Sequence, residues 1–67
     1  MIPDPLLSDR QRRVLRLAAV GLSTFSIARR LDIAPSDVRA ELTAAIEQLG
    51  ARSKIDAVLI AARRGEL

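Results

Sequence analysis

Hydrophobic residues recur at helical spacing along most of this 67-residue chain. In one stretch Val38, Leu42, Ile46 and Leu49 follow one another at intervals of four, four and three residues, which places them on one face of a helix. Similar stripes fill three further segments, and none has the pattern of a strand. The pattern predicts an all-α fold, a compact four-helix domain with helices over residues 9–20, 24–31, 35–49 and 54–64.

Capping residues support the starts of these helices. Ser8 is followed three residues later by Gln11, which makes a capping box for the first helix. Ser23 and Ser53 occupy the cap positions of the second and fourth helices. Pro35 fits the first position of the third helix, where its missing N–H is harmless.

The chain is expected to form one small domain. Residues 1–7 hold two prolines and are expected to be an extended lead-in, and residues 8–67 are expected to be the domain. A chain of this length buries only about 60% of its unfolded surface, so its core is small. The stripes predict a core of Val14, Leu15, Ala18, Leu22, Ile27, Leu31, Ile33, Val38, Leu42, Ile46 and Leu49.

The second and third predicted helices are joined by a very short connection. Ile27, Ala28 and Leu31 share one apolar face of the second helix. Three residues, 32–34, then separate it from the helix that starts at Pro35. Two helices joined in this way form a helix-turn-helix, whose second helix suits the major groove of DNA.

The composition excludes several classes of protein. Cysteine and histidine are absent, and the chain has no glycine-rich phosphate loop. We therefore expect no catalytic residue, no metal site, no cofactor and no enzymatic activity. No apolar run approaches the roughly 20 residues of a membrane span, and no signal-peptide pattern is present, so the expected location is the cytoplasm.

The charge is distributed unevenly. The net charge is +3, with an isoelectric point near 11.1, which permits binding to nucleic acid. Residues 8–21 hold four arginines and one aspartate, whereas residues 35–50 hold one arginine and three acidic residues. The helix expected to face DNA phosphates is therefore the acidic one.

The fourth predicted helix is apolar on nearly every side. A surface helix of a monomer needs one apolar stripe, and a helix that is apolar all round is usually buried on two sides. One explanation is that its alanines are merely tolerated at the surface. The other is that a second copy of the chain covers the outer side, with Leu59, Ile60 and Arg63 at the dimer interface.

Taken together, these segments resemble the LuxR/GerE-type helix-turn-helix domain, which also ends many bacterial response regulators. The C-terminal promoter-binding domain of sigma factors has a similar arginine-rich start, but the turn at residues 49–53 and the fourth helix favour the LuxR type. The resemblance extends from Leu7 to about Arg64. The segments that carry it are Leu7-Ser8-Asp9-Arg10-Gln11-Arg12-Arg13-Val14-Leu15, Gly21-Leu22-Ser23, Ile27-Ala28-Arg29-Arg30-Leu31, Val38-Arg39, Leu49-Gly50 and Arg52-Ser53.

The resemblance implies a bacterial DNA-binding domain that regulates transcription and forms a homodimer through its fourth helix. It implies that the third helix enters the major groove of double-stranded DNA with Arg39, Ala40 and Thr43 facing the bases. It implies further that the DNA backbone is contacted by Ser23, Thr24, Ser36 and Arg52.

Four positions depart from the family pattern. The family commonly has lysine where Phe25 stands, threonine in place of Asp37, histidine in place of Glu41, and a basic residue near Glu47. Asp37 can serve the helix dipole, Glu47 can be a solvated charge, and Glu41 can accept from cytosine N4. Phe25 either folds back onto the domain or is an exposed contact.

Two functions therefore stay open. The first is a sequence-specific DNA-binding transcriptional regulator, either free-standing or the output domain of a longer protein. The alternative is a degenerate helix-turn-helix whose acidic third helix binds a protein partner through Phe25, Glu41 and Glu47. The order of the helices and the net charge favour the first function.

Overall fold

The computed structural model of the protein describes residues 5–67. Within them the chain forms four helices and no strand, as predicted. The first and last helices each end one residue earlier than predicted, because Val20 and Arg64 are cap residues. The helices are α1 (Asp9–Ala19), α2 (Thr24–Leu31), α3 (Pro35–Leu49) and α4 (Lys54–Arg63).

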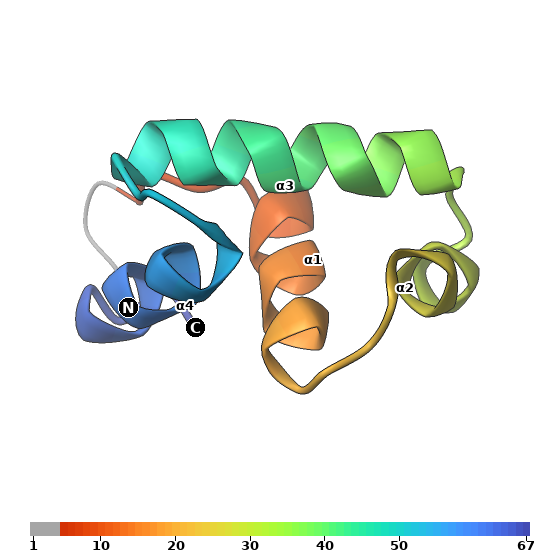
Figure 1. The fold of residues 1–67 in the computed structure, drawn as a ribbon, viewed down its shortest axis with the longest axis horizontal. Coiled ribbons are helices and arrows are strands. Elements are labelled where there is room, and N and C mark those ends of the chain that lie inside the picture. Colours follow the sequence, from red (N-terminus) through yellow and green to blue (C-terminus); the bar gives the residue numbers. More distant parts are fainter. Residues whose placement is uncertain (1–4) are drawn as a thin grey trace.

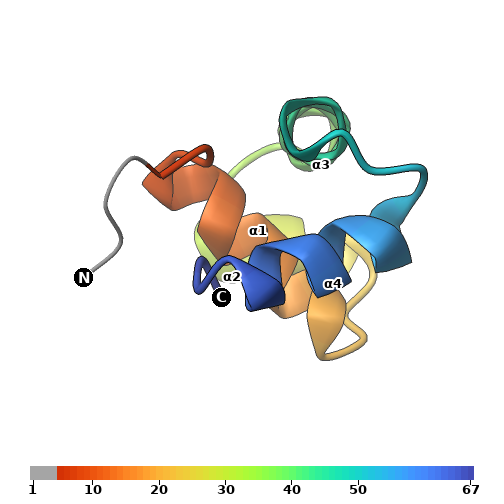
Figure 2. The ribbon, with the colours of Figure 1, turned by 90° about the vertical axis from the view of Figure 1, so that its left-hand side faces the viewer.

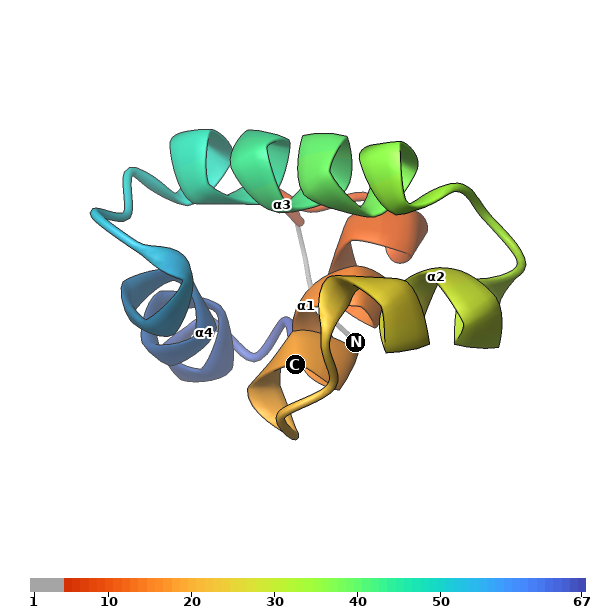
Figure 3. The same cartoon turned by 45° about the vertical axis from the view of Figure 1, so that its right-hand side comes forward.

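The longest helix, α3, lies across the other three. Figure 1 shows α3 along the top of the molecule, α1 beneath its middle, and α2 and α4 on either side of α1. The same order is visible when the molecule is turned (Figure 3). Helix α3 contacts all three other helices, whereas α2 and α4 do not contact each other within the described chain. One side of α3 therefore faces the protein and the opposite side is left bare.

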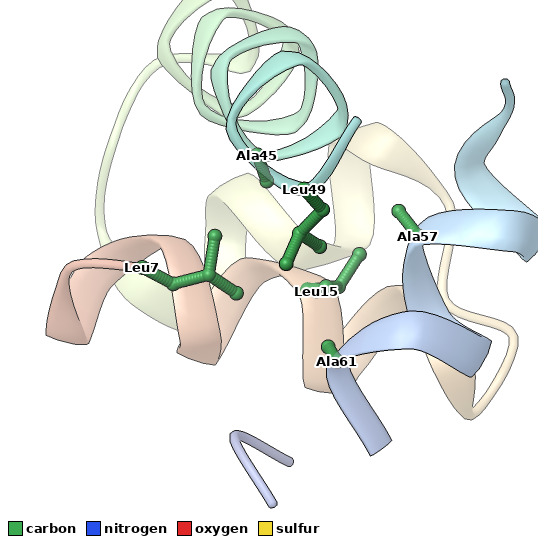
Figure 4. Close-up of a cluster of buried hydrophobic side chains, with 6 residues drawn as sticks. All are labelled: Leu7, Leu15, Ala45, Leu49, Ala57 and Ala61. Carbon is green, nitrogen blue, oxygen red and sulfur yellow. The ribbon is translucent and has the colours of Figure 1, made fainter. Parts of the chain in front are cut away.

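Two clusters of buried side chains hold α3 in place. The first lies between α1, α4 and the C-terminal part of α3, where Leu15, Leu49 and Ala61 meet (Figure 4). The second lies between α1, α2 and the N-terminal part of α3, around Val14, Ile27 and Val38. Leu42 packs against both clusters, so the two halves of the core are continuous beneath α3.

The buried core differs from the predicted one in its details. Six of the eleven predicted residues are fully buried, and Leu22, Leu31, Ile33, Leu42 and Ile46 are only partly buried. A domain this small has little depth, so its longer side chains stay partly in contact with solvent. The prediction omitted further buried residues, which are Leu7, Gln11, Ala28, Ala45, Ala57, Ala61 and Glu66.

All four helices end in the same hydrogen-bonded turn. At the end of α4, the Gly65 N–H donates to the Ala62 carbonyl and the Glu66 N–H donates to the Ala61 carbonyl, at 3.1 and 2.8 Å. This is the Schellman arrangement, which needs one residue with a positive φ. In α1, α3 and α4 that residue is a glycine.

Helix α2 is the exception, because its positive-φ residue is Asp32, with φ 56° and ψ 49°. Aspartate tolerates this conformation better than most residues but still carries a Cβ that disfavours it. Its negative charge also lies at the C-terminal end of the helix dipole, which is unfavourable. The turn between α2 and α3 is thus built on a residue that is poorly suited to its position.

We expect Asp32→Gly to stabilise the domain by about 0.5–1 kcal/mol, because it relieves the conformational cost and the dipole repulsion together. Thermal and urea unfolding, followed by circular dichroism, would measure the change. Asp32→Asn is the matched control, since it removes the charge and keeps the Cβ, and it should give a smaller gain. A loss of stability in Asp32→Gly would contradict this account of the turn.

The two ends of the described chain are joined by a buried carboxylate. Glu66 is 1% exposed, and its Oε1 accepts a hydrogen bond of 2.9 Å from the Leu7 N–H. Its Oε2 accepts one of 2.8 Å from Nε of Arg64. Burial raises the pKa of the Glu66 carboxyl, but these hydrogen bonds outweigh burial and hold the pKa below its ordinary value of 4.5. Leu7, predicted as part of a lead-in, is thereby anchored in the core, while residues 1–4 of that lead-in lie outside the described chain.

Because the Glu66 pKa is lower in the folded protein than in the unfolded chain, its ionised form stabilises the fold. This contribution is complete above the unfolded pKa, near 4.5, and is lost as the pH falls through the folded pKa. We expect Glu66→Gln to cost about 1–3 kcal/mol at pH 7. Between pH 5 and pH 3 the parent should lose more stability than Glu66→Gln in urea unfolding. Equal losses in the two proteins would show that Glu66 does not titrate in this way.

Candidate nucleic-acid interface

The helix-turn-helix consists of α2, the turn at residues 32–34 and α3. Ser23 caps α2, with its Oγ accepting from the Ser26 N–H at 3.2 Å. Ile27 and Ala28 are buried against α1 and α3, which fixes the angle at which α2 supports its neighbour. Seen end-on, α3 stands apart from the other helices at one edge of the molecule (Figure 2). Its outer side is accessible along the whole length of the helix.

The outer side of α3 carries the residues that the sequence pointed to. The predicted base-facing residues Arg39, Ala40 and Thr43 are all exposed, and so are Ser36 and Glu47. On the opposite side, Val38, Ala45 and Leu49 are buried in the two core clusters. The structure therefore brings the predicted set together on one accessible surface.

The predicted backbone-contact residues lie at the two ends of this surface. Ser36 is in the first turn of α3, and Arg52 is exposed in the turn that follows α3. Helix α3 has 15 residues and is therefore about 22 Å long, so these two positions lie at its opposite ends. Thr24 is partly exposed at the start of α2. The Ser23 hydroxyl is already engaged, since it caps α2 and donates to Oγ of Ser26 at 3.1 Å.

The acidic residues of α3 do not all lie on the outer side. Asp37 and Glu41 are one helical turn apart and both form ion pairs with Arg10 of α1. Nη2 of Arg10 is 3.5 Å from Oδ2 of Asp37, and its Nε is 3.2 Å from Oε2 of Glu41. Among the three acidic residues of α3, Glu47 alone has no ion pair within residues 5–67. The contact of Glu41 with a protein partner stays a prediction.

Phe25 is exposed, with 64% of its surface accessible. It does not fold back into the core. It borders a shallow hollow of about 350 Å³ between the end of α2 and the start of α3, whose other lining residues include Arg29, Ile33 and Pro35. An exposed aromatic ring therefore stands beside the start of α3.

The fourth helix has two apolar sides, as its sequence suggested. Ala57 and Ala61 are buried against the domain, and Ile60 is partly buried in the same cluster. On the other side Ile55 and Leu59 are 73% and 50% exposed. Of the predicted interface residues, Leu59 and Arg63 are accessible, whereas Ile60 packs largely against its own domain.

Sequence comparison matches residues 5–61 to the family model described as bacterial regulatory proteins, luxR family. The match covers most of the chain and all of the helix-turn-helix. The chain belongs to the luxR family. This confirms the resemblance inferred from its motifs.

Individual relatives agree with this assignment. The spore germination protein GerE of Bacillus subtilis is 36% identical over 63 residues, covering 94% of this chain and 85% of that protein. A solved structure of the transcription factor GerE superposes with a TM-score of 0.91 at 33% identity and covers 94% of both chains.

Longer relatives exist as well. Candidate HTH-type transcriptional regulators of Mycobacterium tuberculosis and Mycobacterium bovis are 42% identical over 59 residues. The match covers 88% of this chain but only 7% of theirs. The family is described as bacterial regulatory proteins, and these longer relatives are named as transcriptional regulators. Within the described residues, no helix is long and apolar enough to cross a membrane.

Proposed function

We propose that this domain binds double-stranded DNA by inserting the outer side of α3 into the major groove. The observation that carries the proposal is the exposure of Arg39, Ala40 and Thr43 on a helix whose other side is buried against three helices. Arg39 is the residue of this set that can make a bidentate contact to guanine, through O6 and N7. Ala40 and Thr43 offer small side chains that let the helix approach the bases closely.

The ends of α3 are suited to the phosphates on either side of the groove. The length of α3, about 22 Å, exceeds the roughly 12 Å width of the major groove, so Ser36 and Arg52 at its two ends can reach opposite strands. Ala34 provides no side-chain cap, and within residues 5–67 the Ser36 N–H has no intramolecular partner. A free N–H at a helix N-terminus favours an anion such as phosphate.

The charge of this surface indicates weak binding. Arg39 and Arg52 are its basic residues, and Glu47 opposes them on the same side of α3. Each phosphate contact contributes roughly one counterion to the salt dependence, so few contacts mean modest affinity. We infer that DNA binding occurs in the cytoplasm of a bacterium, depends on sequence, and weakens with rising salt by the small slope that few phosphate contacts give.

Arg39→Ala should lower affinity for a preferred duplex, chosen by selection from random sequences, by about 10- to 100-fold. It should also flatten the preference at one base pair, because the bidentate contact to guanine is lost. Fluorescence anisotropy at fixed salt would measure both effects. Arg16→Ala removes the same charge from the exposed side of α1 and should change affinity by less than about threefold. Equal losses in the two variants would mean that Arg39 does not read a base.

We propose further that two copies associate through the outer side of α4. Two exposed apolar residues, Ile55 and Leu59, support this association. They lie one turn apart on the side of α4 that faces away from the core. A stable interface usually buries about 1,200–2,000 Å², which is more than these side chains provide. The dimer is therefore weak in solution and is strengthened on DNA, with half-sites about one helical turn apart.

Leu59→Glu should weaken self-association by about tenfold or more, because the dimer would have to bury an unpaired charge. Sedimentation velocity over a concentration series would measure this, with circular dichroism confirming that helicity is kept. Val20→Glu is the control, since Val20 is a comparably exposed apolar residue outside α4. If the parent dimerises and Leu59→Glu self-associates equally strongly, α4 is not the interface.

A protein partner remains the second candidate, and the exposed ring of Phe25 beside Arg29 is the observation that favours it. Here the helix-turn-helix would bind another protein at the hollow between α2 and α3. Phe25→Ser separates the two functions. It should leave DNA affinity within about threefold if the groove-facing side is α3, and it should abolish a complex whose partner seats on the ring.

A further inference from the structure

We infer that Arg10 is a positioning residue for DNA binding, which it supports by holding the carboxylates of Asp37 and Glu41 on the α1 side of α3. The inference rests on the proposed function of α3. It concerns a residue of α1 that is not itself expected to touch DNA. Its basis is the pair of ion contacts that one guanidinium makes to two carboxylates of the recognition helix.

Asp37, Arg39 and Glu41 border the exposed surface of α3. Successive residues of a helix are separated by about 100°, so Arg39 and Glu41 lie about 160° apart, on opposite flanks of the exposed surface. Asp37 lies one turn before Glu41 on the same flank. The base-reading arginine and the acidic pair therefore border the same surface from its two edges.

Arg10 offsets the negative charge of Asp37 and Glu41. Two carboxylates one turn apart on a helix repel each other and would also repel phosphates that approach that flank. The guanidinium of Arg10 lies within 3.5 Å of both, so its charge offsets part of theirs and draws the side chains towards α1. Glu41 is the better enclosed of the two, with its side chain 22% exposed. Without Arg10 both carboxylates are free to turn outwards.

Within residues 5–67, no other basic residue forms an ion pair with Asp37 or Glu41. Arg12 pairs with Asp9, and Arg64 pairs with Glu66. Arg13 lies one turn after Arg10 on α1, and within residues 5–67 it has no ion pair. Arg13 is thus a matched control for the loss of one positive charge from the same helix.

The test is a double-mutant cycle of DNA affinity, with Arg10→Gln made in the parent and in the Asp37→Asn/Glu41→Gln background. At roughly 50 mM salt, Arg10→Gln should weaken binding of the parent by about threefold to tenfold. In the neutral background it should weaken binding only as much as Arg13→Gln does, because the carboxylates through which Arg10 acts are gone. Arg10→Lys should stay within about twofold of the parent, since it keeps the charge near both carboxylates.

Other results would overturn the inference. An equal loss in both backgrounds would show that Arg10 contacts the DNA itself, and no loss in the parent would show that the carboxylates do not matter. A parent that binds no duplex even at low salt would refute the proposed function, and this inference with it. Thermal melts of each variant separate stability from DNA binding. If Arg10→Gln lowers the stability but leaves the DNA affinity of the folded protein unchanged, Arg10 has a purely structural role and the inference is wrong.

Discussion

The burial of one side of α3 along its whole length is the constraint on which this domain depends. Val38 packs between α1 and α2, Leu49 packs between α1 and α4, and Leu42 joins the two clusters. Because α2 and α4 do not contact each other within residues 5–67, α3 and α1 are what hold them in one unit. The same packing leaves the opposite side of α3 without a protein neighbour within residues 5–67, and that is the side that we propose enters DNA.

The charges on α3 are reconciled with this function by their placement. The sequence suggests a recognition helix that repels phosphate, but two of its three carboxylates are paired with Arg10 at the flank. Glu47 remains on the outer side without an ion pair within residues 5–67. The domain thus combines an exposed helix with few basic residues along it, which agrees with the weak DNA binding that we propose.

Helices and turns were readable from the sequence because they depend on neighbouring residues. The capping box of Ser8 and Gln11 and the proline at the start of α3 both form as predicted. The features that were missed depend on distant contacts. Arg10 meets residues of α3, and Glu66 bonds the N–H of Leu7, 59 residues away. The spacing of apolar residues does not indicate which polar groups will pair across the fold.

Some features of the candidate site were likewise predictable from the sequence, and others were not. The exposure of Arg39, Ala40 and Thr43 follows from helical spacing, since Val38 and Leu42 must point inwards. The burial of small residues such as Ala45 and Ala57 does not follow from helical spacing, because alanine occurs both in protein cores and on protein surfaces. The partial burial of Ile60 likewise depends on how closely α4 approaches α1, which spacing alone cannot give.

The most direct test of the central claim is a titration of the ¹⁵N-labelled domain with a short duplex, followed by amide chemical shifts at low salt. If α3 reads DNA, the largest shifts fall on Ser36, Ala40 and Thr43, with smaller ones at Thr24 and Arg52. Amides on the exposed side of α1, such as those of Arg13 and Arg16, should hardly move. Shifts concentrated on α1, or no shifts with DNA in excess, would contradict the assignment of α3 as the DNA-reading helix.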